Sequence, residues 1–251
     1  VLGAIFFTFQ IYGDFSGYSD IAIGTSRLFC FDLKQNFATP YFSRDIAEFW
    51  RRWHISLSTW FRDYLYIPLG GSRGGTWMKV RNTFAIFLVS GFWHGANWTF
   101  IIWGALNAIY FLPLLLTNNN RKNLGVVAEG KLLPSFREMF AMLTTFMLTV
   151  FAWIFFRAED LNHAFNYIGG IFSESIFNVP YFKDGSDSFA TIILIFILIF
   201  IEWFGRNDKF AIENIYKDSR ITRNIFYMII ILILLIFGNY DSEVEFIYFQ
   251  F

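Results

Sequence analysis

Apolar residues gather in long runs along this chain, and short stretches of charge interrupt the runs. A helix that crosses a membrane needs roughly 20 predominantly apolar residues at 1.5 Å each. Runs near this length predict about six crossings, some of them tilted, broken or buried in protein. They are Leu2–Ile23, Thr83–Phe92, Trp98–Leu116, Met139–Phe156, Phe189–Phe204 and Ile225–Phe237. The pattern therefore predicts an all-α, multi-pass integral membrane protein.

The loops between these runs alternate in their content of Lys and Arg. Basic residues precede the second run and follow the third and the fifth. In contrast, the stretch 157–188 has more acids than bases, and the tail after Phe237 has acids only. Because cytoplasmic loops carry the excess of Lys and Arg, we expect the basic loops to face the cytoplasm and the other two segments to face outward.

Composition excludes several classes of protein. The chain has 251 residues, of which 55% are apolar, 22% aromatic and 16% charged, whereas about 25% are charged in an ordinary soluble domain. One water-soluble core could not hide so much apolar surface, so membrane lipid is the expected surrounding. The net charge is +0 and no stretch forms a basic surface, which argues against a nucleic-acid partner.

The beginning of the chain and its cysteine content bear on its organisation. Val1 opens directly into apolar sequence without a charged leader, so we interpret the chain as a C-terminal fragment of a longer one. No linker or internal repeat is evident, and we expect one membrane domain over residues 1–251. The single cysteine, Cys30, allows no internal disulfide.

One segment, Ser43–Gly71, mixes charge with aromatic residues and does not read as a simple span. Its spacing on a helix predicts one aromatic stripe made of Trp50, Trp53, Leu57, Trp60 and Tyr64. Glu48 and Arg52 fall on the opposite face and can pair at i,i+4. The pattern predicts an interfacial or re-entrant helix. His54 lies at the edge of the stripe, where it either serves a site or merely caps a neighbour on an anchor helix.

A second histidine, His94, lies in the segment Ser90–Trp98. Thirteen residues of helix from Arg81 would place it about 20 Å from the cytoplasmic edge, inside a hydrocarbon slab of roughly 30 Å. An ionisable group at such depth is by default a site hypothesis. Gly91 and Gly95 also form a small-xxx-small pattern, so an interhelical histidine bond within a close-packed helix pair is an equal alternative.

Two carboxylates, Asp14 and Asp20, interrupt the first run. They are six residues apart and point to different sides of a helix, which argues against a metal site. We expect them to line a wet cavity or to meet counter-charges, for which the candidates are Arg27, Arg44, Arg51 and Arg52. A transporter or channel with Asp14, Asp20 and His94 along an ion path is an alternative of a different class. Such a protein would usually show paired, related halves, and none is apparent. His163 is expected to be ordinary surface.

Several longer stretches carry a resemblance to a known family. They are QIYGDFSGYSDIAIG from Gln10, NFATPYFSRDIAEFWRRWHISLSTWFRDYLYIPLGGSR from Asn36, SGFWHGANWTFIIWGALNA from Ser90, WIFFRAED from Trp153 and the terminal FIYFQF. Together they resemble the membrane-bound O-acyltransferase family, and within it the bacterial alginate O-acetyltransferase branch. The resemblance implies an acyltransferase with a funnel-like helical bundle, further helices before Val1, and a place in the bacterial plasma membrane.

The resemblance also implies site residues. His94, in the WHG context, corresponds to the family's catalytic histidine, and His54, in RRWHISLS, to a second family histidine. Acyl transfer to a hydroxyl needs a base, and a neutral imidazole with a reference pKa of about 6.5 suits this task. Trp93 and Asn97 lie close by in sequence and could orient the ring or the substrate.

The expected reaction links the two sides of the membrane. The resemblance implies an acyl thioester such as acetyl-CoA as cytosolic donor, with no bound cofactor. It also implies a periplasmic or extracellular partner protein that passes the group to an exported polysaccharide such as alginate. Arg44, Arg51, Arg52 and Arg62 could attract a phosphate-bearing donor or anchor the interface. Peptidoglycan O-acetylation and D-alanyl transfer to teichoic acid are alternatives with the same fold.

Overall fold

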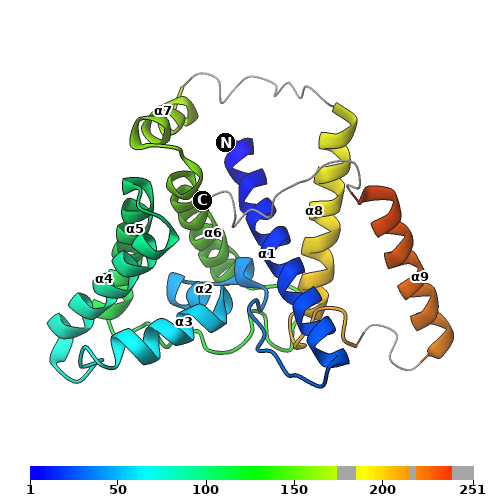
Figure 1. Cartoon of the computed structure of the whole chain (residues 1–251), viewed down its shortest axis with the longest axis horizontal. Helices are drawn as coiled ribbons and strands as arrows, with labels where there is room; N and C mark the ends of the chain where they lie inside the picture. Colours follow the sequence, from blue (N-terminus) through cyan, green and yellow to red (C-terminus); the bar gives the residue numbers. More distant parts are fainter. Residues whose placement is uncertain (174–184, 215–218, 239–251) are drawn as a thin grey trace. The chain divides into compact units, whose positions relative to one another are not determined.

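The computed structural model describes residues 1–173, 185–214 and 219–238, with only the backbone for 185–188, and the described part is helical (Figure 1). The chain divides into two compact units, Val1–Lys183 and Asp184–Gln250. The first contains α1 (Leu2–Leu28), η1 (Pro40–Phe42), α2 (Ile46–Arg52), α3 (Ile55–Phe61), η2 (Arg62–Tyr66), α4 (Gly75–His94), α5 (Trp98–Leu116), α6 (Phe136–Arg157) and α7 (Leu161–Ile171). The second contains α8 (Gly185–Gly205) and α9 (Arg220–Phe237).

The helices agree with the predicted apolar runs, since each of the six runs falls within one helix. Three described helices, α5, α6 and α9, are long and apolar enough to cross a membrane, and α8 contains a shorter apolar stretch. The prediction of an all-α membrane protein is therefore confirmed. The expectation of one domain over residues 1–251 stays a prediction.

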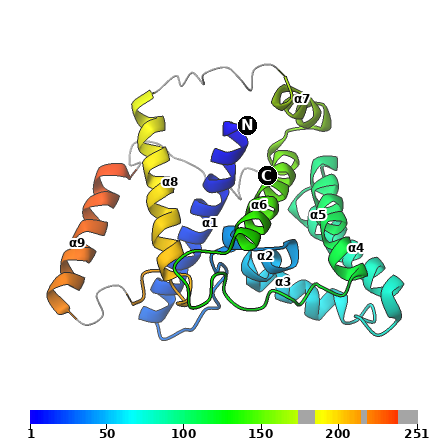
Figure 2. The same ribbon diagram turned by 180° about the vertical axis from the view of Figure 1, so that it is seen from behind.

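Helices α4 and α5 form a tightly packed hairpin, visible from both sides of the molecule (Figures 1 and 2). A Cβ atom on Gly91 would collide with the carbonyl oxygen of Phe100, and one on Gly104 with that of Phe87. Small residues at such crossings let two backbones approach closely. The close approach predicted at Gly91 is confirmed, and it places the end of α4 against the start of α5.

The predicted continuous helix between Ser43 and Gly71 is wrong, because the chain breaks between α2 and α3. His54 has a left-handed backbone, with φ 44°. The preceding loop holds this break: the N–H of Ile55 donates to the carbonyl oxygen of Asn36 over 3.0 Å, and the Asn36 side chain accepts from Ser56. Trp53 is consequently buried at 2% exposure, whereas Trp60 at 53% is not, so the single aromatic stripe does not exist.

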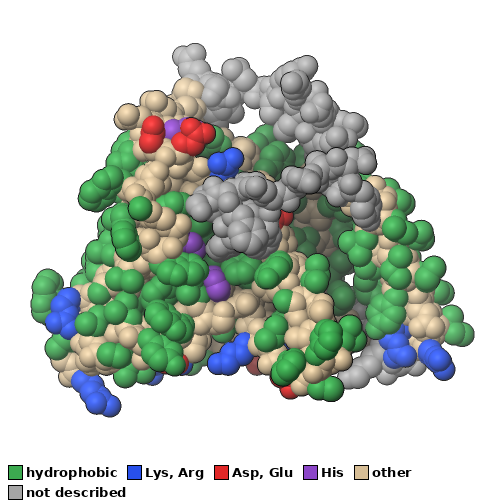
Figure 3. Space-filling view, viewed as in Figure 1, with side chains coloured by type: hydrophobic (Ala, Val, Ile, Leu, Met, Phe, Trp, Pro, Cys, Tyr) green, Lys and Arg blue, Asp and Glu red, His purple; other side chains and the backbone are tan. Residues whose placement is uncertain are grey.

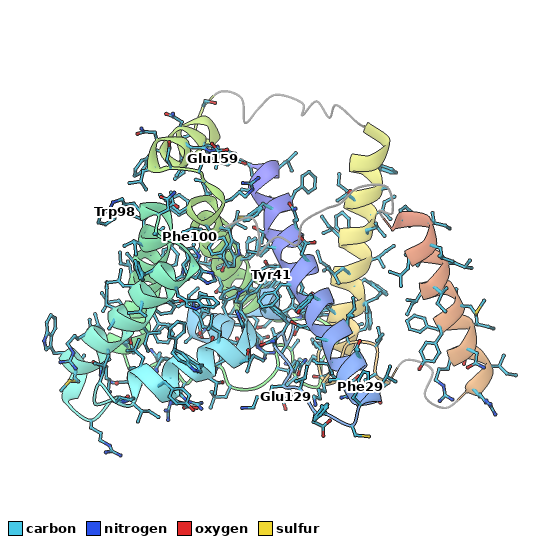
Figure 4. The ribbon with its side chains drawn as sticks, in the orientation of Figure 1. Phe29, Tyr41, Trp98, Phe100, Glu129 and Glu159 are labelled. Carbon is cyan, nitrogen blue, oxygen red and sulfur yellow. The ribbon has the colours of Figure 1, made fainter. Side chains whose placement is uncertain are left out.

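The core of the first unit is an aromatic cluster contributed by α1, α2, α5 and α6. Trp53 contacts Trp153 at 5.2 Å between ring centroids, and Trp153 stacks on Trp103 at 5.8 Å. The Tyr41 hydroxyl, labelled in Figure 4, donates to the carbonyl oxygen of Thr8 over 2.6 Å and so ties η1 to α1.

Candidate active site

His94 ends α4 at a tip that is walled by aromatic rings. Its imidazole meets Trp93, Trp103 and Phe156 edge-on, at centroid distances of 4.9, 5.2 and 5.0 Å. Phe100 lies at 6.3 Å. The imidazole is only partly buried, and Figure 3 shows histidine side chains reaching the surface near the middle of the face in view. The arrangement is a half-open apolar cage around one titratable group.

His54 lies next to this cage and is strained. It lies within range of a long-range charge interaction with His94, and its ring meets Phe15 edge-on at 4.7 Å. The Nδ1 atom is buried and has no hydrogen-bond partner within the described residues. A left-handed backbone on a non-glycine residue costs about 1–3 kcal/mol and is characteristic of functional sites. The structure thus brings together both histidines that the sequence singled out.

The two neighbours predicted to orient the ring behave differently. Trp93 packs against the His94 ring while remaining 55% exposed. The Asn97 amide is engaged at both ends with the backbone: its oxygen accepts from the N–H of Thr99 over 3.1 Å, and its nitrogen donates to the carbonyl oxygen of Glu159 over 2.7 Å. Asn97 therefore acts on the connection that follows His94.

The arginines of α2 surround a buried carboxylate. Glu48 is 1% exposed and accepts from Arg44 and Arg52, each at 3.0 Å. Both arginines also donate to the carbonyl oxygen of Gly125. Burial alone would lower the pKa of the Arg44 guanidinium, but its hydrogen bonds to Glu48 and the charge of that carboxylate raise the pKa above its usual value. The Glu48–Arg52 pair is as predicted, and its carboxylate is buried.

Arg51 grips the same loop without a carboxylate. It donates to the carbonyl oxygens of Asn120 and Asn123 over 2.9 and 2.7 Å, and burial lowers its pKa. Arg62 instead pairs with its neighbour Asp63 at the surface. Arg44, Arg51 and Arg52 thus fasten the connection between α5 and α6 onto α2. Their expected role toward a phosphate-bearing donor stays a prediction.

Asp14 and Asp20 do not meet the arginines proposed for them. Both are exposed on α1, on the face away from the buried Tyr12 and Phe15. No ion pair found in residues 1–173, 185–214 or 219–238 includes either carboxylate. Over those same ranges, no group of three His, Cys, Asp or Glu side chains could hold a metal ion.

Apart from Trp93, the rings that surround His94 were not singled out by the sequence. Phe100 and Trp103 are three residues apart on α5, and Phe156 is near the end of α6. Their helical spacing is a weak signal, because the same spacing occurs in any apolar helix. Only the hairpin of α4 and α5 and the packing of α6 beside it bring the three rings to one histidine.

Comparison with known proteins places this geometry in context. Residues 1–127 match the profile described as "MBOAT, membrane-bound O-acyltransferase family". The chain is 43% identical to "Probable alginate O-acetylase AlgI" of Azotobacter vinelandii over 79% of the chain and 38% of the relative. It is 48% identical to the protein of that name from Pseudomonas aeruginosa over 68% of the chain and 31% of the relative.

A third relative carries a different printed name. "Peptidoglycan O-acetyltransferase" of Helicobacter pylori is 43% identical over 66% of this chain and 30% of its own length. The chain therefore spans between 30% and 38% of the length of these three bacterial relatives.

Proposed function

Because this chain belongs to the membrane-bound O-acyltransferase family, we propose that it carries the catalytic histidine of an O-acetyltransferase. The enzyme transfers an acetyl group from a cytosolic thioester toward the hydroxyls of an exported polysaccharide such as alginate. The observation that carries this proposal is His94, a half-open imidazole in an aromatic cage beside a second histidine.

His94 serves as the general base. The neutral imidazole takes the proton of the acceptor hydroxyl while the oxygen attacks the thioester carbonyl. The tetrahedral intermediate then collapses, the thiolate leaves, and it takes that proton back from the imidazolium. Positioned acid–base help contributes about 10²- to 10⁴-fold. The remainder comes from alignment of donor and acceptor, which the rigid rings Trp103 and Phe156 favour by limiting where the reacting groups can lie.

His54 is a second group at the reacting centre. Its buried Nδ1 has no partner in the described chain, so it can bind a substrate atom or a water at no cost to another protein bond. The strained backbone at this residue supports such a role, since glycine would occupy this left-handed position with less strain than histidine does.

The two ends of the first unit support transfer across the membrane. Helix α6 has 22 residues and is about 33 Å long. One end holds the arginine-clasped loop near Glu129, and the other holds Glu159 beside the start of α5 (Figure 4). If the basic end faces the cytoplasm, a thioester can reach His94 from one side and a hydroxyl from the other. The acetyl group then crosses without its carrier.

The relatives' printed names favour alginate as the final polymer. Two of the three relatives are called alginate O-acetylases, and each matches a larger share of this chain than the peptidoglycan enzyme does. An outward-facing partner protein that accepts the acetyl group and delivers it to the polymer completes the proposed route.

The test uses the full-length protein in proteoliposomes with a labelled acetyl thioester supplied on the cytoplasmic side. His94→Ala should abolish labelling of the acceptor. Phe92→Ala, on the same helix and at an exposed ring, should leave it unchanged. Retained labelling in a folded His94→Ala protein would refute His94 as the base. Mass analysis of the polymer separates acetyl from alanyl transfer, and alginate from peptidoglycan.

A further inference from the structure

A cavity of about 370 Å³ opens where α1 begins, α6 ends and α7 follows. Its volume lies within the range of small-molecule sites, about 300–1,000 Å³. It is separate from the histidine site, because neither His94 nor His54 lines it. By loop charge, this end of the unit is the one expected to face outward.

Five polar side chains from three elements converge on this cavity. They are Gln10 of α1, Arg157 and Glu159 around the end of α6, and His163 and Tyr167 of α7. In the part of the chain that the structure describes, no hydrogen bond or ion pair engages any of these side chains; Arg157 only lies over the Phe7 ring, 5.9 Å from its centroid. The walls therefore present hydrogen-bond donors and acceptors that a ligand could engage.

The inner wall of the cavity contains a tryptophan with an unpaired donor. Trp153 lines the cavity and is only 2% exposed, yet its indole Nε1–H has no partner among the described residues. Buried donors of this kind are rare and call for an explanation. Trp153 also contacts Phe156 at 5.1 Å, and Phe156 contacts His94 at 5.0 Å. Two successive rings, Trp153 and Phe156, therefore lie between the cavity and the proposed base.

We propose that this cavity binds one pyranose unit of a glycan, with a preference for a uronate. A sugar ring offers hydroxyls that both donate and accept, which suits Gln10, Glu159 and His163, and apolar C–H faces that pack on aromatic rings. Arg157 can bind a sugar carboxylate through two parallel hydrogen bonds. The inference rests on the proposed function for the outward orientation, and it adds that this chain itself holds the glycan.

The test measures binding apart from transfer. The full-length protein in plain phospholipid nanodiscs is titrated calorimetrically with a uronate tetrasaccharide and with a neutral glucose tetrasaccharide. The unaltered protein should bind the uronate more tightly. Arg157→Gln should weaken uronate binding about tenfold or more and barely change neutral binding. Trp153→Phe should weaken both. Asn166→Ala, exposed on α7 outside the cavity, should change neither.

Two outcomes would overturn this inference. One is that the unaltered protein binds neither tetrasaccharide. Binding that appears only when the nanodiscs contain a glycolipid would identify a lipid headgroup as the ligand instead. The other is equal affinity in the Arg157→Gln and unaltered proteins, a comparison that does not depend on whether Trp153→Phe folds. His94→Ala should retain sugar binding. If the unaltered protein transfers acetyl groups but does not bind the sugar, only this inference is refuted. If the His94→Ala protein still transfers acetyl groups, only the proposed function is refuted.

Discussion

The Asn97 side chain donates a hydrogen bond to the backbone carbonyl oxygen of Glu159 over 2.7 Å and joins the start of α5 to the turn after α6. This bond spans the site, because His94 lies three residues before Asn97 and Phe156 three residues before Glu159. The same amide caps α5 through its oxygen. One side chain thus holds the histidine and a ring of its cage in register.

Substitutions at Asn97 should separate these two roles. Asn97→Ala loses the cap and the tether, and we expect a loss of about 1–2 kcal/mol in stability. Asn97→Ser keeps a capping hydroxyl but cannot reach Glu159, so its stability should lie closer to that of the unaltered protein. Both should lower kcat for acetyl transfer, by about tenfold to a hundredfold, since the histidine shifts relative to its cage. Thermal unfolding in detergent and initial rates check this. An Asn97→Ser enzyme with the original kcat would show that the tether does not position the site.

Glu48 should be a large contributor to stability despite its charge. Glu48→Gln leaves Arg44 and Arg52 facing each other without the buried carboxylate between them, and we expect a loss of about 3–5 kcal/mol. Asp63→Asn breaks an exposed ion pair with Arg62 and serves as the matched control, with little change expected. The midpoint of thermal unfolding measures both. Similar midpoints for the two variants would show that the buried Glu48 carboxylate between Arg44 and Arg52 does not stabilise the protein.

The α4–α5 hairpin should be intolerant of side chains at its crossing. Gly91→Ala places a methyl group against the Phe100 carbonyl, so α4 must move away from α5 and carry His94 with it. We expect lower stability together with a fall in transfer of at least about tenfold. Gly169→Ala on α7 adds a methyl group with no atom within 4 Å and should be neutral or slightly stabilising. If Gly91→Ala transfers normally, the close approach is not needed for the site.

His54 could serve the reaction or only the turn between α2 and α3, and the two roles predict opposite effects of substitution on transfer. His54→Gly relieves the left-handed backbone and should match or exceed the stability of the unaltered protein, by up to about 1–2 kcal/mol. Transfer should nevertheless fall sharply, because the imidazole is gone. Asparagine also tolerates a left-handed backbone, so His54→Asn should keep the stability of the unaltered protein but not its transfer activity. A glycine variant with full transfer would mean that His54 serves only the turn.

The helices could be predicted because they depend on local pattern, and the same local pattern singled out two histidines whose roles stay predictions. Every apolar run became helical, and His94 and His54 each lie in a short, specific motif. The continuous helix over Ser43–Gly71 failed for a reason no periodicity reveals. Asn36, about 20 residues earlier, supplies the hydrogen bonds that stabilise a break at His54.

By itself, the sequence determined the helical membrane class and the family and singled out two histidines as candidates, since these follow from apolar length and from residues adjacent in the chain. Only the tertiary structure decided which charged and polar side chains form structural hydrogen bonds and ion pairs. Glu48 and Asn97 look like surface polar residues until α6 and the loop at Gly125 pack against them, because hydrogen-bond partners far apart in sequence leave no periodic trace. The same holds for the cavity at Trp153, whose walls come from three helices.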